Sequence, residues 1–218
     1  MSNLTQPTYS GRAIICGQSG GSPFVGYRLS SHSFGNRQLR LTQPGRVQVA
    51  PNQSTDPFDA AQARFIFYDC LIAGEQNVVS ANGLHGDNIA VKLKRGSSVL
   101  DALAFGLLSW DFEDDGSGTP RIAAVLNLTD PTYIYLGIIK PAGLHVDRLP
   151  LHEGHAYILA TNTFNLKDTF SFNWQVKPGA APTAEALLTG DFITQLQLSH
   201  PVAAAAWQNG NIASVGAQ

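Results

Sequence analysis

The stretch SWDFEDDGSGTPR (residues 109–121) separates an apolar helix from a run of strands, and the fold follows from these flanks. Upstream, Ser98 and Asp101 form a capping-box pattern that predicts a helix running to about Trp110. Downstream, the apolar run that begins at Arg121 predicts a buried strand. The helix is apolar almost all round, so we expect it to lie against a sheet with little exposed face.

Four carboxylates follow the end of this helix, which is an unfavourable place for negative charge. The helix macrodipole costs each nearby anion roughly 0.3 to 1 kcal/mol, and crowded carboxylates raise one another's pKa. Such a group can keep a protonated acid beside an ionised base near neutral pH. Asp111 and Glu113 are therefore candidate catalytic residues, although a solvated acidic loop would have the same sequence.

The composition is that of one globular domain without a strongly charged surface. The chain has 218 residues, 44% hydrophobic and 14% charged, with a net charge of -2, which fits a protein with a substantial core. The charge argues against nucleic acid or an anionic membrane as partner, so any bound anion should be small. No apolar run reaches the roughly 20 residues of a membrane span, and we expect the protein in the cytoplasm. Residues 1–10 are interpreted as a polar tail and 11–218 as a single domain.

Neither a metal nor an organic cofactor is expected from the sequence. Cys16 and Cys70 fall inside strand-like apolar runs, as reduced core cysteines do. The chain has no CxxC or HExxH pattern, and its six histidines are scattered.

Strand-like runs occur along the whole chain and predict an α+β fold. They cover residues 12–17, 24–29, 46–50, 64–72, 77–80, 122–128, 133–139, 144–149, 155–161 and 169–176. The turn between the first two is typical of a hairpin. Strands in adjacent runs, with helices grouped between them, argue against a doubly wound sheet.

Three further elements are expected to be helical. A short helix is predicted at residues 89–94, capped by Asp87, and a longer one at residues 184–197. Pro201 is expected to begin an alanine-rich helix or turn.

A polar loop at residues 30–40 directly follows Arg28 and contains Ser31 and Arg37. Each arginine can hold two phosphate oxygens, and hydroxyls and backbone amides can bind the remainder. The loop therefore predicts a site for a phosphate monoester. A surface loop that happens to be basic is the alternative.

Tyr68 interrupts an apolar strand, and Asn82, Gly83 and His85 follow the next strand. A tyrosine near a strand end can donate to a substrate, although it is more often a core residue with a bonded hydroxyl. A strand-to-helix loop can line a pocket with amides. A structural role would explain His85 equally well.

Several segments, taken in order, resemble the archaeal-type inosine monophosphate (IMP) cyclohydrolases. They are Gly11-Arg12, YRLSSHSFGNR (27–37), YDC (68–70), SANG (80–83), DFEDD (111–115), TPRI (119–122), YLGI (135–138) and HPV (200–202). The resemblance implies a four-layer α-β-β-α sandwich, like that of N-terminal-nucleophile hydrolases, with two mainly antiparallel sheets. It also implies closure of 5-formamidoimidazole-4-carboxamide ribonucleotide to IMP with loss of water, the last step of purine synthesis.

The residues and the resemblance predict the same catalytic groups. The reaction needs a proton acceptor, an oxyanion donor and an acid that assists the departure of water. Glu113, assisted by Asp111, is expected to handle the protons, while Tyr68 and Arg28 donate to the formyl oxygen.

The other predicted contacts with substrate come from Ser31, Arg37, Asn82, Gly83, His85 and Arg121. Ser31 and Arg37 would hold the phosphate. Asn82, Gly83 and His85 would line the base or ribose. Arg121 would balance the carboxylates or form an ordinary ion pair. All of this requires the basic loop from Arg28 to Arg37 to face Glu113 across one cleft.

Two other functions stay open. An amide hydrolase could share the sandwich, but no candidate nucleophile begins the first strand, since Ser2 lies well upstream and Cys16 lies inside it. A purine-nucleotide sensor could keep the phosphate loop without the chemistry, although it would not need Tyr68 and Glu113. The sequence also leaves open whether the protein forms a homo-oligomer.

Overall fold

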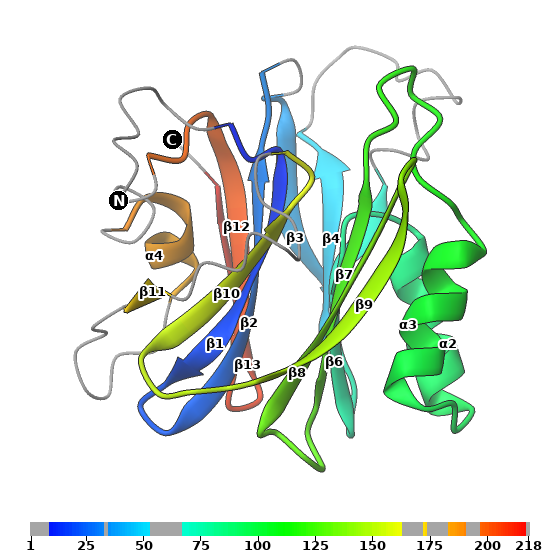
Figure 1. Cartoon of the computed structure of the whole chain (residues 1–218). Coiled ribbons are helices and arrows are strands. Elements are labelled where there is room, and N and C mark those ends of the chain that lie inside the picture. The colour runs from blue at the N-terminus through cyan, green and yellow to red at the C-terminus, as the bar shows by residue number, and fades with distance from the viewer. Residues whose placement is uncertain are drawn as a thin grey trace.

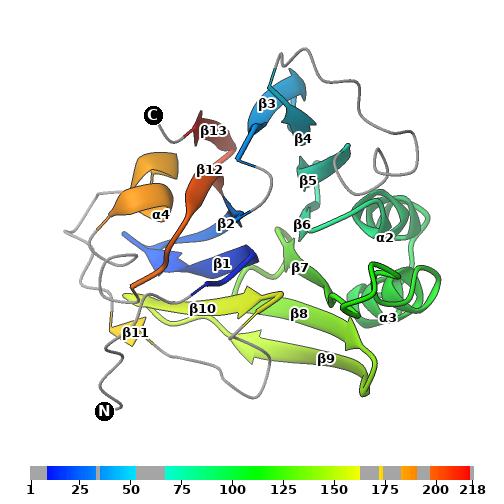
Figure 2. The same ribbon diagram turned by 90° about the horizontal axis from the view of Figure 1, so that it is seen from above.

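The protein is a sandwich of two antiparallel sheets with helices on both outer faces, seen from two directions in Figure 1 and Figure 2. The computed structural model describes residues 9–32, 35–52, 67–162, 172–173, 183–190 and 197–216. In this part of the chain the layers follow the order helix, sheet, sheet, helix. The predicted α-β-β-α arrangement is therefore confirmed. The division into a tail and one domain stays a prediction.

One sheet has seven strands in the order β3-β4-β5-β6-β7-β8-β9. Their bounds are β3 (Arg37–Gln43), β4 (Arg46–Pro51), β5 (Tyr68–Ala73), β6 (Asn77–Ala81), β7 (Arg121–Asn127), β8 (Tyr133–Lys140) and β9 (Gly143–Pro150). Each strand pairs antiparallel with the next along the chain. This sheet therefore follows the chain order from one edge to the other.

The second sheet has six strands in the order β11-β10-β1-β2-β12-β13. Their bounds are β1 (Arg12–Ser19), β2 (Ser22–Ser30), β10 (His155–Ala160), β11 (Phe172–Asn173), β12 (Pro201–Gln208) and β13 (Asn211–Gly216). The predicted hairpin of β1 and β2 turns at Gly20 and Gly21, both with positive φ, 60° and 75°. Their amides donate to the Glu153 carboxylate at 2.7 and 3.0 Å, which ties the hairpin to the start of β10.

The helices α2 (His85–Lys94) and α3 (Val99–Leu108) cover the outer face of the seven-stranded sheet, and α4 (Ala184–Thr189) covers the other sheet (Figure 1). The predicted cap of α3 is confirmed, because Ser98 Oγ accepts from the Asp101 N–H at 3.1 Å. The expected start of α2 at Ile89 is wrong. Asp87 lies in its first turn rather than at its cap, where its carboxylate pairs with Arg46 of β4 at 2.6 Å.

The helix α3 is more exposed than its sequence predicts. Leu103 and Leu107 are fully buried against the sheet, whereas Leu100, Phe105 and Leu108 are 46%, 56% and 54% exposed. The expectation of little exposed face is wrong, because a helix on one side of a sheet buries only the residues that point toward it.

Two strands differ from the sequence expectation. Pro201 opens the strand β12, not a helix, because this segment pairs with β2 on one edge and with β13 on the other. Pairing on both edges outweighs the helix propensity of alanine. The last residues of the predicted 30–40 loop, from Arg37 onward, instead belong to the strand β3. It lies at the sheet edge, where Leu39 is buried but Leu41 is 52% exposed, so its hydrophobic alternation is weak.

Three predicted segments lie partly outside the described residues. The strand predicted at 64–72 is described only from residue 67, and it is seen as β5, which begins at Tyr68. The strand at 169–176 is described only at residues 172–173, as β11. The helix at 184–197 is described as α4, which ends before Gly190.

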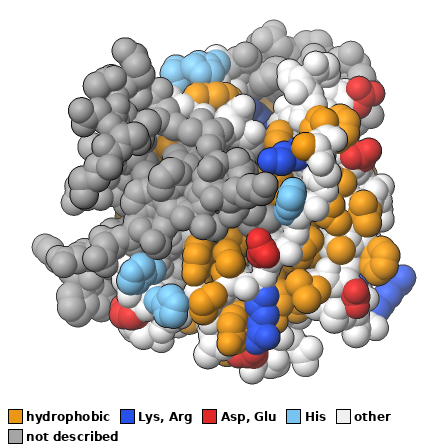
Figure 3. All heavy atoms as spheres, in the orientation of Figure 1, with side chains coloured by type: hydrophobic (Ala, Val, Ile, Leu, Met, Phe, Trp, Pro, Cys, Tyr) orange, Lys and Arg blue, Asp and Glu red, His pale blue; other side chains and the backbone are white. Residues whose placement is uncertain are grey.

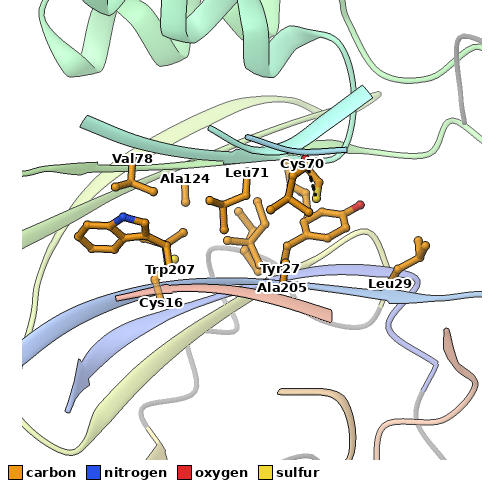
Figure 4. Packing of buried hydrophobic residues seen from close by; sticks show 14 of the residues in the cluster. Cys16, Tyr27, Leu29, Cys70, Leu71, Val78, Ala124, Ala205 and Trp207 are labelled. Carbon is orange, nitrogen blue, oxygen red and sulfur yellow. Dashed lines mark hydrogen bonds between the residues drawn. The ribbon is translucent and has the colours of Figure 1, made fainter. Parts of the chain in front are cut away.

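Alternating residues of facing strands fill the space between the sheets. Ile14 and Cys16 of β1, with Tyr27 and Leu29 of β2, face the seven-stranded sheet, and Figure 4 shows several of these side chains between the two layers. Both Cys16 and Cys70 are free and buried, as predicted. Burial raises the pKa of both thiols.

None of the helices in the described ranges is long and apolar enough to cross a membrane. On the face shown in Figure 3, basic and acidic side chains are interspersed among apolar and neutral ones. This distribution fits the small net charge of -2.

Candidate active site

Glu113 is the centre of a buried charged cluster that lies beside the first residues of β1 and β7. The residue is 3% exposed. Its Oε2 accepts from Arg12 Nη2 at 3.0 Å, and its Oε1 lies 3.8 Å from Arg121 Nη1. Two guanidinium groups thus face one carboxylate, which leaves one positive charge in excess when all three are ionised.

Strand geometry and a closed loop bring these groups together. Arg12 points to the same side of β1 as Ile14 and Cys16, because side chains alternate along a strand. The Glu113 N–H donates to Thr119 O at 2.8 Å, which closes the loop before β7. Closure of this loop returns Glu113 to the start of β7, where Arg121 lies.

Arg12 is held in its charged form by its neighbours. Burial alone would lower the pKa of Arg12, but Glu113, Tyr68 and Tyr27 raise it, and the resulting pKa lies above the usual value. The cation therefore persists at any physiological pH, although its side chain is only 13% exposed.

A pair of tyrosines joins the two sheets close to Arg12. Tyr27 Oη on β2 lies 2.7 Å from Tyr68 Oη on β5, and both side chains are buried. Burial raises the pKa of Tyr68, while Arg12 and Arg37 act in the opposite direction. The pKa of Tyr27 is raised well above its usual value, by burial first and by Tyr68 second.

Asn82 fixes the backbone on both sides of Arg121. Its Nδ2 donates to Pro120 O at 2.9 Å, and its Oδ1 accepts from the Ile122 N–H at 2.8 Å. The Arg121 guanidinium also lies 5.5 Å from the Trp110 ring, a cation–π geometry. Both polar atoms of the Asn82 side chain are thus bonded to the backbone that flanks Arg121, and its contact with substrate stays a prediction.

Gly83 lies directly against the Arg121 guanidinium and beside the His85 ring. A Cβ atom at residue 83 would lie 2.7 Å from Arg121 Nη1 and 3.2 Å from His85 Nδ1. His85 Nε2–H donates to Ile122 O at 2.9 Å, while Nδ1 has no partner in the described part of the chain. Burial lowers the pKa of His85 to about 3, and both Arg121 and Arg12 act in the same direction. The imidazole is therefore neutral near pH 7.

The acidic residues do not crowd together as predicted. Only Glu113 turns into the cluster, whereas Asp111, Asp114 and Asp115 are exposed. The Asp111 carboxylate accepts from the Phe112 N–H at 2.8 Å. The pKa of Asp115 is lowered rather than raised, because hydrogen bonds from Thr119 and Ser117 outweigh its burial. The expected mutual increase in pKa is therefore wrong for Asp115.

Arg28 does not reach this cluster, and the expectation that it faces Glu113 across a cleft is wrong. It lies on β2 next to Tyr27, so alternation sends its side chain to the opposite face of the sheet. It is fully buried there, where it donates to the hydroxyls of Ser10 and Ser30. It also donates to the carbonyls of Leu188 and Leu198, at 3.5 and 3.4 Å.

Ser31 and Arg37 are brought together, as predicted, in a pocket of about 530 Å³ where β3 meets β12 and β13. The lining residues are Ser31, Gly35, Arg37, Gln38, Leu39, Asn52, His200, Pro201, Val202, Ser214, Val215 and Gly216. The charge of Arg37 also lowers the pKa of Tyr68, so this pocket and the tyrosine pair lie within electrostatic range of each other.

Sequence reasoning missed Arg12 and Tyr27 as site residues. Both lie in segments that were correctly predicted as strands, and both share the alternation phase of buried residues such as Ile14 and Val25. Both faces of these strands are buried, so a charged or hydroxyl-bearing side chain among their apolar residues was the available signal, and it applies to Arg28 as well. In the described residues, no group of three or more His, Cys, Asp or Glu side chains has the arrangement of a metal site.

Fold and site together define an α-β-β-α sandwich protein with a buried charged cluster around Glu113 and a polar pocket that contains Ser31 and Arg37. A sequence model of the family described as "IMP cyclohydrolase-like protein" matches residues 9–211. The chain belongs to this family, and the resemblance seen in the sequence is confirmed.

Individual relatives agree with this assignment. The protein named IMP cyclohydrolase from Methanocaldococcus jannaschii is 33% identical over 200 residues, which are 90% of this chain and 92% of the relative. The proteins of the same name from Methanococcus aeolicus and Methanothrix thermoacetophila are 37% and 38% identical over 155 and 154 residues. Each of these matches covers 70% of this chain and 73% of the relative.

Proposed function

We infer that this protein is an IMP cyclohydrolase, an enzyme that closes the formamido ribonucleotide to IMP and releases water in purine biosynthesis. The observation that carries this proposal is the similarity to the Methanocaldococcus jannaschii IMP cyclohydrolase over 90% of the chain. The site gives it a chemical basis, since a carboxylate, two guanidinium groups and a tyrosine pair lie at one place.

Ring closure joins the carboxamide nitrogen to the formyl carbon and expels the formyl oxygen as water. In our proposal Glu113 takes a proton from the attacking nitrogen and later returns it to the departing hydroxyl. Tyr68 gives its proton to the formyl oxygen and recovers one from the formamide nitrogen. Both groups end in their starting state, so the protons balance over one turnover.

Arg12 takes the role that the sequence suggested for Arg28. Its guanidinium is bonded to Glu113 and acts electrostatically on Tyr68, so it can stabilise the negative charge that develops on the formyl oxygen. Asp111, which is exposed two positions before Glu113, would assist from the solvent side.

The phosphate would bind in the pocket that contains Ser31 and Arg37, because a guanidinium fork and a hydroxyl suit phosphate oxygens. Gly83 and His85 would contribute to base or ribose binding by keeping Arg121 in place. A cytoplasmic location belongs to the same proposal, as does a homo-oligomer that covers exposed apolar residues such as Phe105.

The test is to mix the purified protein with the formamido ribonucleotide and follow the ultraviolet change as the purine forms. We expect repeated turnover that saturates with substrate and is absent after heat denaturation of the protein. Tight IMP binding without turnover would instead identify a sensor. A chain found by mass spectrometry to start at an internal Ser, Thr or Cys would favour an amide hydrolase.

A further inference from the structure

The contact between Tyr27 and Tyr68 links the candidate site to the interior of the sandwich. The two hydroxyl oxygens are 2.7 Å apart, and the side chains are 0% and 1% exposed. Figure 4 shows the Tyr27 ring among apolar side chains between the sheets. A buried hydroxyl needs a partner, and the one that Tyr27 contacts belongs to a residue assigned to the proton transfers.

The role proposed for Tyr68 decides which hydroxyl donates. Arg12 lowers and Cys70 raises the pKa of both tyrosines, whereas the hydrogen bond between them lowers the pKa of Tyr68 and raises that of Tyr27. Since Tyr68 has one proton and gives it to the formyl oxygen in the proposed reaction, its Oη can only accept in this bond, and Tyr27 donates. The Tyr68 proton is then free to point elsewhere.

We propose that Tyr27 is a positioning residue whose hydroxyl donates to Tyr68 Oη and so aims the Tyr68 proton at the oxygen that leaves the substrate. This inference rests on the proposed cyclohydrolase function. It gives Tyr27 no contact with substrate, so its whole effect passes through Tyr68. The groups that face the pair are Arg12, Arg37 and Cys70.

A double-mutant cycle tests this dependence. Tyr68→Phe should lower kcat by about 100-fold, since it removes the proton donor. Tyr27→Phe should lower kcat by about tenfold and leave KM near the wild-type value, because it misdirects the donor without touching the substrate. In the Tyr68→Phe background, the Tyr27→Phe substitution should cause no further loss.

The pH profile of kcat gives a second readout. The role requires protonated Tyr68, so activity falls as pH rises through the pKa of Tyr68. Loss of the bond from Tyr27 removes an influence that lowers that pKa. The alkaline limb of the Tyr27→Phe profile should therefore move to higher pH.

Tyr157→Phe is the control, because it removes a tyrosine hydroxyl of β10 that is not part of the site and donates to Pro150 O of β9 at 2.7 Å. It should keep the wild-type kcat and pH profile. An unchanged kcat in Tyr27→Phe would overturn the inference, as would a further tenfold loss in the double variant. Thermal melting of each variant shows whether a loss of kcat is caused by unfolding. Absence of turnover in the wild-type protein would instead refute the proposed function.

Discussion

Arg12 and Arg28 lie on neighbouring strands of one sheet, yet they point to opposite sides of it. Arg12 faces the seven-stranded sheet and meets Glu113 at 3.0 Å. Arg28 pairs in register with Ala13 and Ala204, small residues that leave room for it under α4, and its hydrogen-bond partners in the described part of the chain are uncharged. One face of the sheet thus carries an ion pair, whereas on the other face no acidic partner of Arg28 lies among the described residues.

The two environments move the pKa of arginine in opposite directions. Burial lowers the pKa of Arg28 to about 10. Burial acts on Arg12 as well, but Glu113 and the two tyrosines more than offset it. Burial is therefore common to both residues, and the carboxylate partner distinguishes a candidate catalytic arginine from a structural one. The following substitutions test this contrast in order of their expected effect on turnover.

Glu113→Gln should have the largest effect. The amide keeps the size of the side chain but cannot accept a proton from the attacking nitrogen, so turnover should fall by about 100-fold or more while nucleotide binding persists. Steady-state kinetics and calorimetric titration with IMP measure the two properties. Asp114→Asn removes an exposed carboxylate from the same loop and serves as control. Unchanged turnover in Glu113→Gln would exclude the carboxylate from proton transfer.

Gly83→Ala should have an intermediate effect. Its new methyl group would lie 2.7 Å from Arg121 Nη1 and would displace the guanidinium from Glu113. We expect turnover to fall by about tenfold, as small misplacements in a site do. Gly74→Ala is the control, because a Cβ there meets only Asn77 O at an ordinary 3.6 Å. Equal rates for the two variants would show that the position of Arg121 is unimportant.

Arg28→Met should have the smallest effect on turnover and a clear effect on stability. The substitution leaves buried carbonyl and hydroxyl groups without their donor, which should cost about 1 to 3 kcal/mol of unfolding free energy. Urea denaturation measures this loss, and the kinetic assay should give a rate near that of the wild type. A hundredfold loss of turnover in a folded Arg28→Met protein would restore Arg28 to the catalytic group.

The sequence predicted the helices and strands better than it predicted which face of a sheet each side chain occupies. Local signals such as the Ser98 cap and the glycine turn of the first hairpin were enough to place α3, β1 and β2. The partner of Arg12 could not be predicted in the same way, because it depends on contact with Glu113, 101 positions away along the chain. Tyr27 and Arg28 are adjacent in the sequence and looked like one motif, but side chains alternate along a strand, so the two point to opposite faces of the sheet.

Small residues also set how closely α4 can approach its sheet. Ala204 and Ala206 of β12 pack in the same cluster as Leu187, and a Cβ on Gly26 would come within 2.2 Å of the Leu187 methyl group. Side chains much larger than the present ones therefore do not fit at these positions unless α4 moves. Exchange for glycine or serine should be tolerated at Ala204 and Ala206, whereas any side chain at Gly26 requires Leu187 to move. A branched side chain at any of the three positions would lift the helix away from the layer that shelters Arg28.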